Sequence, residues 1–327
     1  MEIGKIPIDK LKEIVLNKIG FRRDDVLVHA GIGEDSAVVD LANDLLVVSS
    51  DPITGAEQNA GKLAVYVACN DLAAMGASPV GIQIVLLLPA QVTETFIVSL
   101  MQEIDQTACS INVEILGGHT EILSHVTKPI IVVTAIGRVS REQLVCSANA
   151  CPGDDLVLTK GLGIEGTYIL ACDYRELLLD KGVEPGIIAT AREYDRKLSV
   201  VEEGLLAAKL GANAMHDVTE GGLYGALTEM AIASGKGFEL FNDDLPISLE
   251  TEVICAALGL DPAGLISSGS MLIAIPESRD LINRLGEAGI PAARIGRVIE
   301  QGRFVLTNGQ KKGFKWGEKD ELWSLME

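Results

Sequence analysis

The stretch VACNDLAAMGASPVG (67–81) places a carboxylate inside an otherwise apolar helix. Helical spacing of small and aliphatic residues predicts a helix over 59–75, which a glycine and then a proline bring to an end. A buried carboxylate is costly unless a cation or hydrogen-bond donors compensate it. Asp71 therefore requires a partner. Lys62 is nine residues earlier, which is off the adjacent helical turns.

Composition narrows the class of protein. The 327 residues carry 46 acidic against 27 basic side chains, a net charge of −19, which argues against a nucleic-acid partner. The six cysteines are scattered without a C-x-x-C, so we expect reduced thiols and no structural zinc. No signal peptide or membrane-length apolar run is recognised, and we expect a cytoplasmic protein with no membrane contact.

Periodicity predicts an α+β fold, because strands and helices mix without strict alternation. Strands are expected over 35–41, 45–50, 82–88, 113–116, 130–139, 155–159, 270–275, 294–299 and 303–307. Helices are expected after Asp9 and over 59–75, 93–110, 163–171, 198–210, 223–233 and 279–288. The aperiodic stretch SANACPG (147–153) predicts a boundary between two domains, 1–148 and 149–327.

Acidic residues recur where strands meet glycine-rich turns. Asp35 lies in GIGEDS, Asp51 follows LLVVSS, and Asp217 lies in HDVTEGG. His119 lies in GGHTE, which is expected to follow the strand over 113–116. Such carboxylates are typical ligands for Mg²⁺ ions that carry nucleotide phosphates. Each alone is equally typical of a turn or helix cap, but a cap cannot explain Asp71 in the middle of a helix.

Two familiar phosphate motifs are incomplete. The P-loop requires Ser or Thr after Gly61-Lys62, where the chain has leucine. The stretch GLGIEG (161–166) matches G-x-G-x-x-G between a strand and a helix, but no strand ending in an acidic residue follows about 20 residues later. A packing turn or a backbone phosphate cradle is the better interpretation, and a nicotinamide-dependent oxidoreductase remains an alternative.

In series, these segments resemble the superfamily of aminoimidazole ribonucleotide (AIR) synthetase, selenophosphate synthetase, thiamine-monophosphate kinase and the hydrogenase maturation factor HypE. The resemblance extends over nearly the whole chain through GIGEDSAVV, SSDPITG, GKLAVYVACNDLAAMGASP, GGHTE, PGDDLVLTKGLGIEGT, HDVTEGGL and SSGSMLIAIP. It implies two α+β domains, a homodimer whose N-terminal strands form a shared barrel, and a cleft that holds ATP and Mg²⁺.

The resemblance also implies roles for individual residues. Metal ligands would be Asp35, Asp51, Asp71 and Asp217, and the catalytic residues would be Asp71, His119 and Asp217. Cofactor-binding residues would be Asp35, Ser50, Asp51, Asn70, Asp71, Gly118, His119, Thr219 and Glu220.

Within the superfamily, the chain is most similar to the HypE group. HypE proteins end in a cysteine-bearing tail on which a carbamoyl group is dehydrated, whereas no cysteine follows Cys255 here. The resemblance implies an ATP- and Mg²⁺-dependent enzyme that phosphorylates or activates an oxygen of a small molecule or a carrier-bound group. A role in hydrogenase maturation would then involve a partner protein that supplies the cysteine. Alternatives are a thiamine-monophosphate-kinase-like or selenophosphate-synthetase-like phosphotransferase and a non-catalytic nucleotide-binding paralogue.

Overall fold

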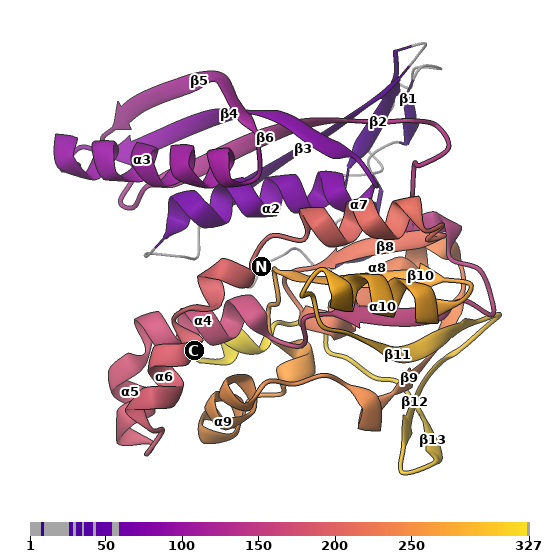
Figure 1. The fold of residues 1–327 in the computed structure, drawn as a ribbon. Coiled ribbons are helices and arrows are strands. Elements are labelled where there is room, and N and C mark those ends of the chain that lie inside the picture. The colour runs from indigo at the N-terminus through magenta and orange to yellow at the C-terminus, as the bar shows by residue number, and fades with distance from the viewer. Residues whose placement is uncertain are drawn as a thin grey trace.

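A computed structural model describes residues 8–9, 26–28, 31–34, 36–41, 44–53 and 59–325 (Figure 1). These residues form two mixed sheets with packed helices, which confirms the α+β expectation. The helix expected beyond Asp9 and the acidic residue Asp35 lie outside the described residues. No described helix has the length and apolar character that a membrane crossing requires.

The first sheet has the strand order β1-β2-β3-β6-β4-β5. Its strands are β1 (Val26–Val28), β2 (Ala37–Asp40), β3 (Leu45–Ile53), β4 (Ser78–Pro89), β5 (Glu114–Leu123) and β6 (Ile130–Val139). Helices α2 (Ala60–Ala74) and α3 (Glu94–Ser110) lie against it, and α2 packs on β3 and β6 (Figure 1).

One expectation about this sheet is wrong. GGHTE was expected in a loop after a strand over 113–116, but it lies within β5, which pairs in parallel with β4. A Cβ on Gly118 would lie 1.8 Å from the carbonyl oxygen of Ile84, so only glycine admits this close approach between the strands. Glycine pairs often indicate a turn, but here they lie inside the strand.

The second sheet has the order β13-β12-β9-β11-β7-β10-β8. Its strands are β7 (Asp155–Thr159), β8 (Ala214–Val218), β9 (Gly237–Phe241), β10 (Ser270–Ile275), β11 (Ala292–Ile299), β12 (Arg303–Thr307) and β13 (Gln310–Gly313). Helices α7 (Val201–Lys209) and α10 (Ser278–Glu287) cover one face, and α8 (Gly222–Ser234) packs on the other. A separate helical cluster contains α4 (Ile164–Asp173), α5 (Arg175–Asp180), α6 (Pro185–Ala191) and α9 (Leu249–Leu258).

Helix α2 lies between the two sheets, with α7 of the second half against it (Figure 1). The two helices approach closely because Gly204 of α7 has no side chain. A Cβ there would lie 2.4 Å from the carbonyl oxygen of Ala73. The buried Asn70 side chain accepts a hydrogen bond from the Val200 N–H and donates one to the Leu198 carbonyl, both at 2.8 Å. Helix α2 is thus hydrogen-bonded to the segment that leads into α7.

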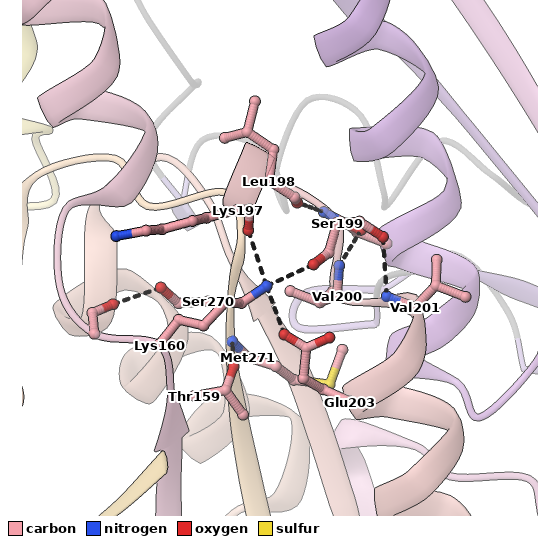
Figure 2. Close-up of polar contacts among 12 residues, drawn as sticks. Thr159, Lys160, Lys197, Leu198, Ser199, Val200, Val201, Glu203, Ser270 and Met271 are labelled. Atoms are coloured by element: carbon pink, nitrogen blue, oxygen red, sulfur yellow. Dashed lines mark hydrogen bonds and ion pairs between the residues drawn. The ribbon is translucent and has the colours of Figure 1, made fainter. Parts of the chain in front are cut away.

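The same segment is held from the other side by a buried lysine (Figure 2). The Lys160 ammonium donates to the carbonyl oxygens of Lys197 and Ser199 at 2.8 and 2.5 Å, and it pairs with Glu203 at 2.5 Å. Burial lowers the pKa of Lys160 and raises that of Glu203, and the attraction between them opposes both shifts. The path of residues 197–203 is therefore fixed by charge-assisted hydrogen bonds from Lys160, which follows β7, and by the Asn70 amide of α2.

Candidate functional site

Asp71 is partnered by the strand β3. The Ser49 hydroxyl donates to Asp71 Oδ2 and lies 3.3 Å from Asp51 Oδ2. Ser49 and Asp51 share one side of the strand because side chains alternate along it. Asp71 is only 8% exposed, and Lys62 pairs with Asp195 instead, at 2.5 Å. A single hydroxyl thus joins two carboxylates, and two like charges this close favour a bound cation.

These carboxylates line a cavity of about 510 Å³ between the two halves of the chain. Leu63, Val67 and Asp71 reach it at intervals of four residues, so one face of α2 forms part of its wall. The same periodicity directs Asn70 away from the cavity and toward the second half of the chain. The adjacent Asn and Asp of the sequence motif therefore have different structural environments.

The second domain contributes the end of β8 and the turn that follows. Asp217, Thr219 and Glu220 all line the cavity, and Asp217 is 2% exposed. Asp217 lies in the strand β8, not in the turn before a helix where the sequence suggested it. The neighbouring His216 is also buried, with its Nε2 2.8 Å from Glu229 Oε2. Residues more than 140 positions apart in the sequence thus meet across one cavity.

The cavity contains carboxylates that were not expected from the sequence, and two of them have raised pKa values. Glu165 comes from the glycine-rich stretch 161–166, and burial raises its pKa to about 7 despite a hydrogen bond with Ser268. Asp320 accepts backbone hydrogen bonds from Gly221 and Leu322, and burial raises its pKa to about 6. The glycine-rich motif therefore begins a helix that carries an acid into the site, and a glutamate at the start of a largely apolar helix was the signal in the sequence.

Carboxylates dominate the polar part of the cavity lining, and the rest of the lining is largely apolar. Among the described lining residues there is no lysine or arginine, and the carboxylates come from Glu34, Asp51, Asp71, Glu165, Asp217, Glu220, Glu229, Glu318 and Asp320. The described residues contain no group of three His, Cys, Asp or Glu side chains already placed to hold a metal by themselves. Mg²⁺ commonly completes its shell with water and phosphate oxygens, so this donor set fits a cation that arrives with a phosphate ligand.

Four of the predicted site residues lie apart from the described lining of this cavity, and a fifth is Asp35, outside the described residues. The Ser50 hydroxyl is 2.8 Å from that of Thr134, on the side of β3 opposite Ser49. Gly118 and His119 lie on β5, where the His119 side chain is 66% exposed and 3.6 Å from Glu121. Asn70 joins the two domains as described above. Binding or catalytic roles for these residues stay predictions.

Two family models match most of both halves of the chain. The profile "AIR synthase related protein, N-terminal domain" matches residues 33–139, and the corresponding C-terminal profile matches residues 151–308. A protein of Methanocaldococcus jannaschii, named as a candidate hydrogenase expression/formation protein, is 30% identical over 83% of this chain and 80% of its own length. The chain belongs to the AIR synthase-related family.

Other relatives within this family have different names. The carbamoyl dehydratase HypE of Rhodobacter capsulatus is 26% identical over 91% of this chain and 87% of its own length. A selenide, water dikinase of M. jannaschii is 27% identical over 94% of this chain and 93% of its own length. The family resemblance is thus shared by a dehydratase and a dikinase.

Solved structures of the family share the fold. Escherichia coli HypE superposes with a TM-score of 0.74 at 25% identity, over 86% of this chain and 90% of its own. A HypE solved in complex with ATP has a TM-score of 0.72 at 22% identity, over 98% of this chain and 97% of its own. A thiamine monophosphate kinase from Aquifex aeolicus has a TM-score of 0.71 at 20% identity, over 94% of this chain and 99% of its own.

In this AIR synthase-related chain, part of the cavity wall lies beyond the matched domains. Trp316, Asp320 and Trp323 all line the cavity and follow residue 308, where the C-terminal profile match ends. The Trp323 indole N–H donates to Glu220 Oε1 at 2.9 Å, which ties this last segment to the turn after β8. The described end of the chain is therefore part of the site.

Proposed function

We propose that this AIR synthase-related protein is an ATP- and Mg²⁺-dependent enzyme. It phosphorylates or activates an oxygen, such as an amide oxygen, of a small molecule or a carrier-bound group. The observation that carries the proposal is the meeting of Asp51, Asp71 and Asp217 from two domains in one acidic cavity. The relatives add support, because one is a dikinase and one solved HypE holds ATP.

The residues present suit this chemistry. Bound Mg²⁺ would neutralise the nucleotide phosphates, and Asp51, Asp71 and Asp217 would hold it, with Asp35 a further predicted ligand. Ser49 orients the first two carboxylates through its hydroxyl. Most of the catalytic effect in such a reaction comes from positioning and charge neutralisation, which a cavity lined by residues of both domains can provide.

We assign the protein to the HypE type within the family and propose that it acts in hydrogenase maturation. The names of two relatives, a hydrogenase expression/formation protein and HypE, support this assignment. We propose a maturation protein as its partner. A solved HypE–HypF complex contains a chain of the same fold, which supports such an association. We further propose a cytoplasmic homodimer, in which the exposed His119 would serve a site completed by a second subunit.

Calorimetry tests the nucleotide site. Wild-type protein should bind the ATP analogue AMPPCP only when Mg²⁺ is present. Asp71→Asn should weaken binding at least tenfold, or about 1.4 kcal/mol, because a charged ligand of the cation is lost. Asp105→Asn, an exposed change of the same chemistry on α3, should bind as the wild type does. Equal affinity in the two variants would exclude Asp71 from the site.

Turnover separates the remaining alternatives. Release of inorganic phosphate from ATP in the presence of a carbamoylated cysteine peptide would support the HypE-type reaction. Phosphate release with selenide would instead assign a selenophosphate-synthetase-like enzyme. Formation of ADP and thiamine diphosphate from ATP and thiamine monophosphate, without free phosphate, would assign a thiamine-monophosphate-kinase-like enzyme. Nucleotide binding without ATP turnover in the presence of any of these acceptors would assign a non-catalytic paralogue. A thermal shift with NAD and none with Mg²⁺-AMPPCP would favour the oxidoreductase alternative.

A further inference from the structure

A second pocket of about 380 Å³ adjoins the acidic cavity. It is lined by Thr228, Arg303, Phe314, Lys315, Trp316 and Glu318. Trp316 and Glu318 line both spaces, so the indole of Trp316 lies at the boundary between them. Unlike the acidic cavity, this pocket contains two basic side chains.

The hairpin formed by β12 and β13 brings these basic side chains together. Phe314 follows β13, and its backbone N–H donates to the Arg303 carbonyl at 2.9 Å. The Phe314 ring makes edge contacts with Tyr224 and Phe238, at centroid distances of 5.4 and 5.0 Å. This anchor fixes the segment that carries Lys315 beside Arg303. The two cations therefore lie at one pocket through backbone pairing and aromatic packing.

Helix α8 provides the surface on which Trp316 rests. Gly221, Gly225 and Thr228 are spaced four and three residues apart, so they lie along one face of the helix start. A Cβ on Gly221 would lie 2.5 Å from Trp316 Cζ2, and one on Gly225 would lie 3.4 Å from Trp316 Cη2. The glycines thus admit the indole ring, and Trp316 and Thr228 line the same pocket.

Most polar groups of this pocket are hydrogen-bond donors. The Thr228 hydroxyl and the Trp316 Nε1 are buried and have no hydrogen-bond partner among the described residues, and Thr228 is only 5% exposed. Arg303 and Lys315 form no ion pair with any residue that the structure describes. Glu318 is the only carboxylate in the described lining. A buried donor without an acceptor is costly, so a bound acceptor would stabilise this arrangement.

We propose that this second pocket binds the anionic group, a carboxylate or a phosphate, of the acceptor substrate. The inference rests on the proposed function, because the acidic cavity takes the Mg²⁺-nucleotide and leaves the basic pocket for the other reactant. Two cations and two neutral donors match the oxygens of a carboxylate or phosphate. The acceptor is then an organic anion whose reactive oxygen extends past Trp316 into the acidic cavity. Phe314 and Trp316 provide apolar surface for its body.

The two tryptophans of the chain are placed differently, because Trp316 lines both spaces and Trp323 lines the acidic cavity alone. Trp316 adjoins the basic pocket, whereas the Trp323 indole is bonded to Glu220 of the acidic cavity. Their indole N–H signals can be resolved by ¹H–¹⁵N NMR of the full chain and assigned with Trp316→Phe. Phenyl phosphate and benzoate are the probes, and benzyl alcohol is the neutral control.

The proposal predicts that at least one anion shifts the Trp316 signal saturably, while benzyl alcohol does not. Phenyl phosphate acting alone would identify a phosphate site, and benzoate acting alone would identify a carboxylate site. Arg303→Gln and Lys315→Gln should each raise the Kd at least fivefold. Lys312→Gln, an exposed change on β13, should leave the Kd unchanged. Absence of a saturable shift with both anions, or equal affinity in all three variants, overturns the proposal.

A titration with Mg²⁺-AMPPCP in the same samples keeps the two proposals distinguishable. The nucleotide should shift the Trp323 signal in wild-type protein and fail to do so in Asp71→Asn. The anion response of Trp316 should survive that substitution. A normal nucleotide response without an anion response overturns the second site alone, and the reverse pattern overturns the nucleotide site alone.

Discussion

Asn70 and Val200 are joined by a 2.8 Å hydrogen bond from the Val200 N–H to the side-chain oxygen of Asn70. The same amide donates to Leu198, so one side chain of α2 satisfies two backbone groups of the second domain. Asp71, the next residue, faces the acidic cavity. Consecutive side chains on a helix diverge by about 100°, which allows the Asn-Asp pair to serve domain docking and the site at once.

Replacing Asn70 should loosen the domain contact. Asn70→Ala leaves the Val200 N–H and the Leu198 carbonyl buried without this partner, which should cost about 2–4 kcal/mol in the free energy of unfolding. Urea unfolding followed by circular dichroism measures the loss. Asn149→Ala, an exposed change of the same chemistry, should cost less than about 0.5 kcal/mol. If the two variants are equally stable, the amide does not hold the domains together.

The buried pair of Lys160 and Glu203 should show strong coupling. Lys160→Met leaves a buried carboxylate and two carbonyls without the ammonium, and should destabilise the fold by about 3–5 kcal/mol. The double variant Lys160→Met/Glu203→Leu removes the uncompensated charge and should recover part of that loss. Denaturant unfolding of the single and double variants completes the cycle. Additive losses would show that the two charges do not interact.

Gly204 should resist substitution although it lies in a helix. Gly204→Ala gains helix propensity but brings a methyl group within 2.4 Å of the Ala73 carbonyl oxygen, so α7 must move away from α2 and Tm should fall. Gly286 of α10 has open space at the same position, and Gly286→Ala should gain about 0.5–1 kcal/mol. Differential scanning calorimetry compares the pair. A rise in Tm for both variants would contradict the close contact between the helices.

Glu165 should make stability depend on pH. The pKa of Glu165 is raised by burial from 4.5 to about 7, so between these values the unfolded chain has lost a proton that the folded protein retains. Stability should therefore fall as the pH rises through this window and level off above it, by up to about 3 kcal/mol. Thermal unfolding from pH 4 to 8 measures the slope, which Glu165→Gln should reduce. Glu252→Gln, which is exposed on α9, should retain the full slope.

Local periodicity was sufficient for much of the fold. The helix expected over 59–75 is α2, and the strands expected over 155–159 and 270–275 are β7 and β10 with the same bounds. These segments are apolar, and glycine, proline or polar residues in the sequence mark where each one ends. Strands β8 and β9 were missed because polar residues interrupt them, and their pairing with β10 and β11 is a long-range contact that no local pattern reports.

The site was only partly predictable for the same reason. Asp51, Asp71 and Asp217 do meet in one cavity, and three acids in series were a strong signal. Strand alternation, however, places Ser49 and not Ser50 beside Asp71. Asp320 lies in a tail without periodicity, so its approach to the cavity follows from tertiary packing alone.

Helix α2 contributes to the cores of both halves, so the two halves cannot be separated without exposing core residues. Its apolar side chains pack with the first sheet, while Ala73 and Ala74 belong to the cluster around α7 and α10. Separating the halves would expose both surfaces to water and break the Asn70 bonds. The chain should accordingly melt in one cooperative step, and neither half alone should fold as an independent fragment.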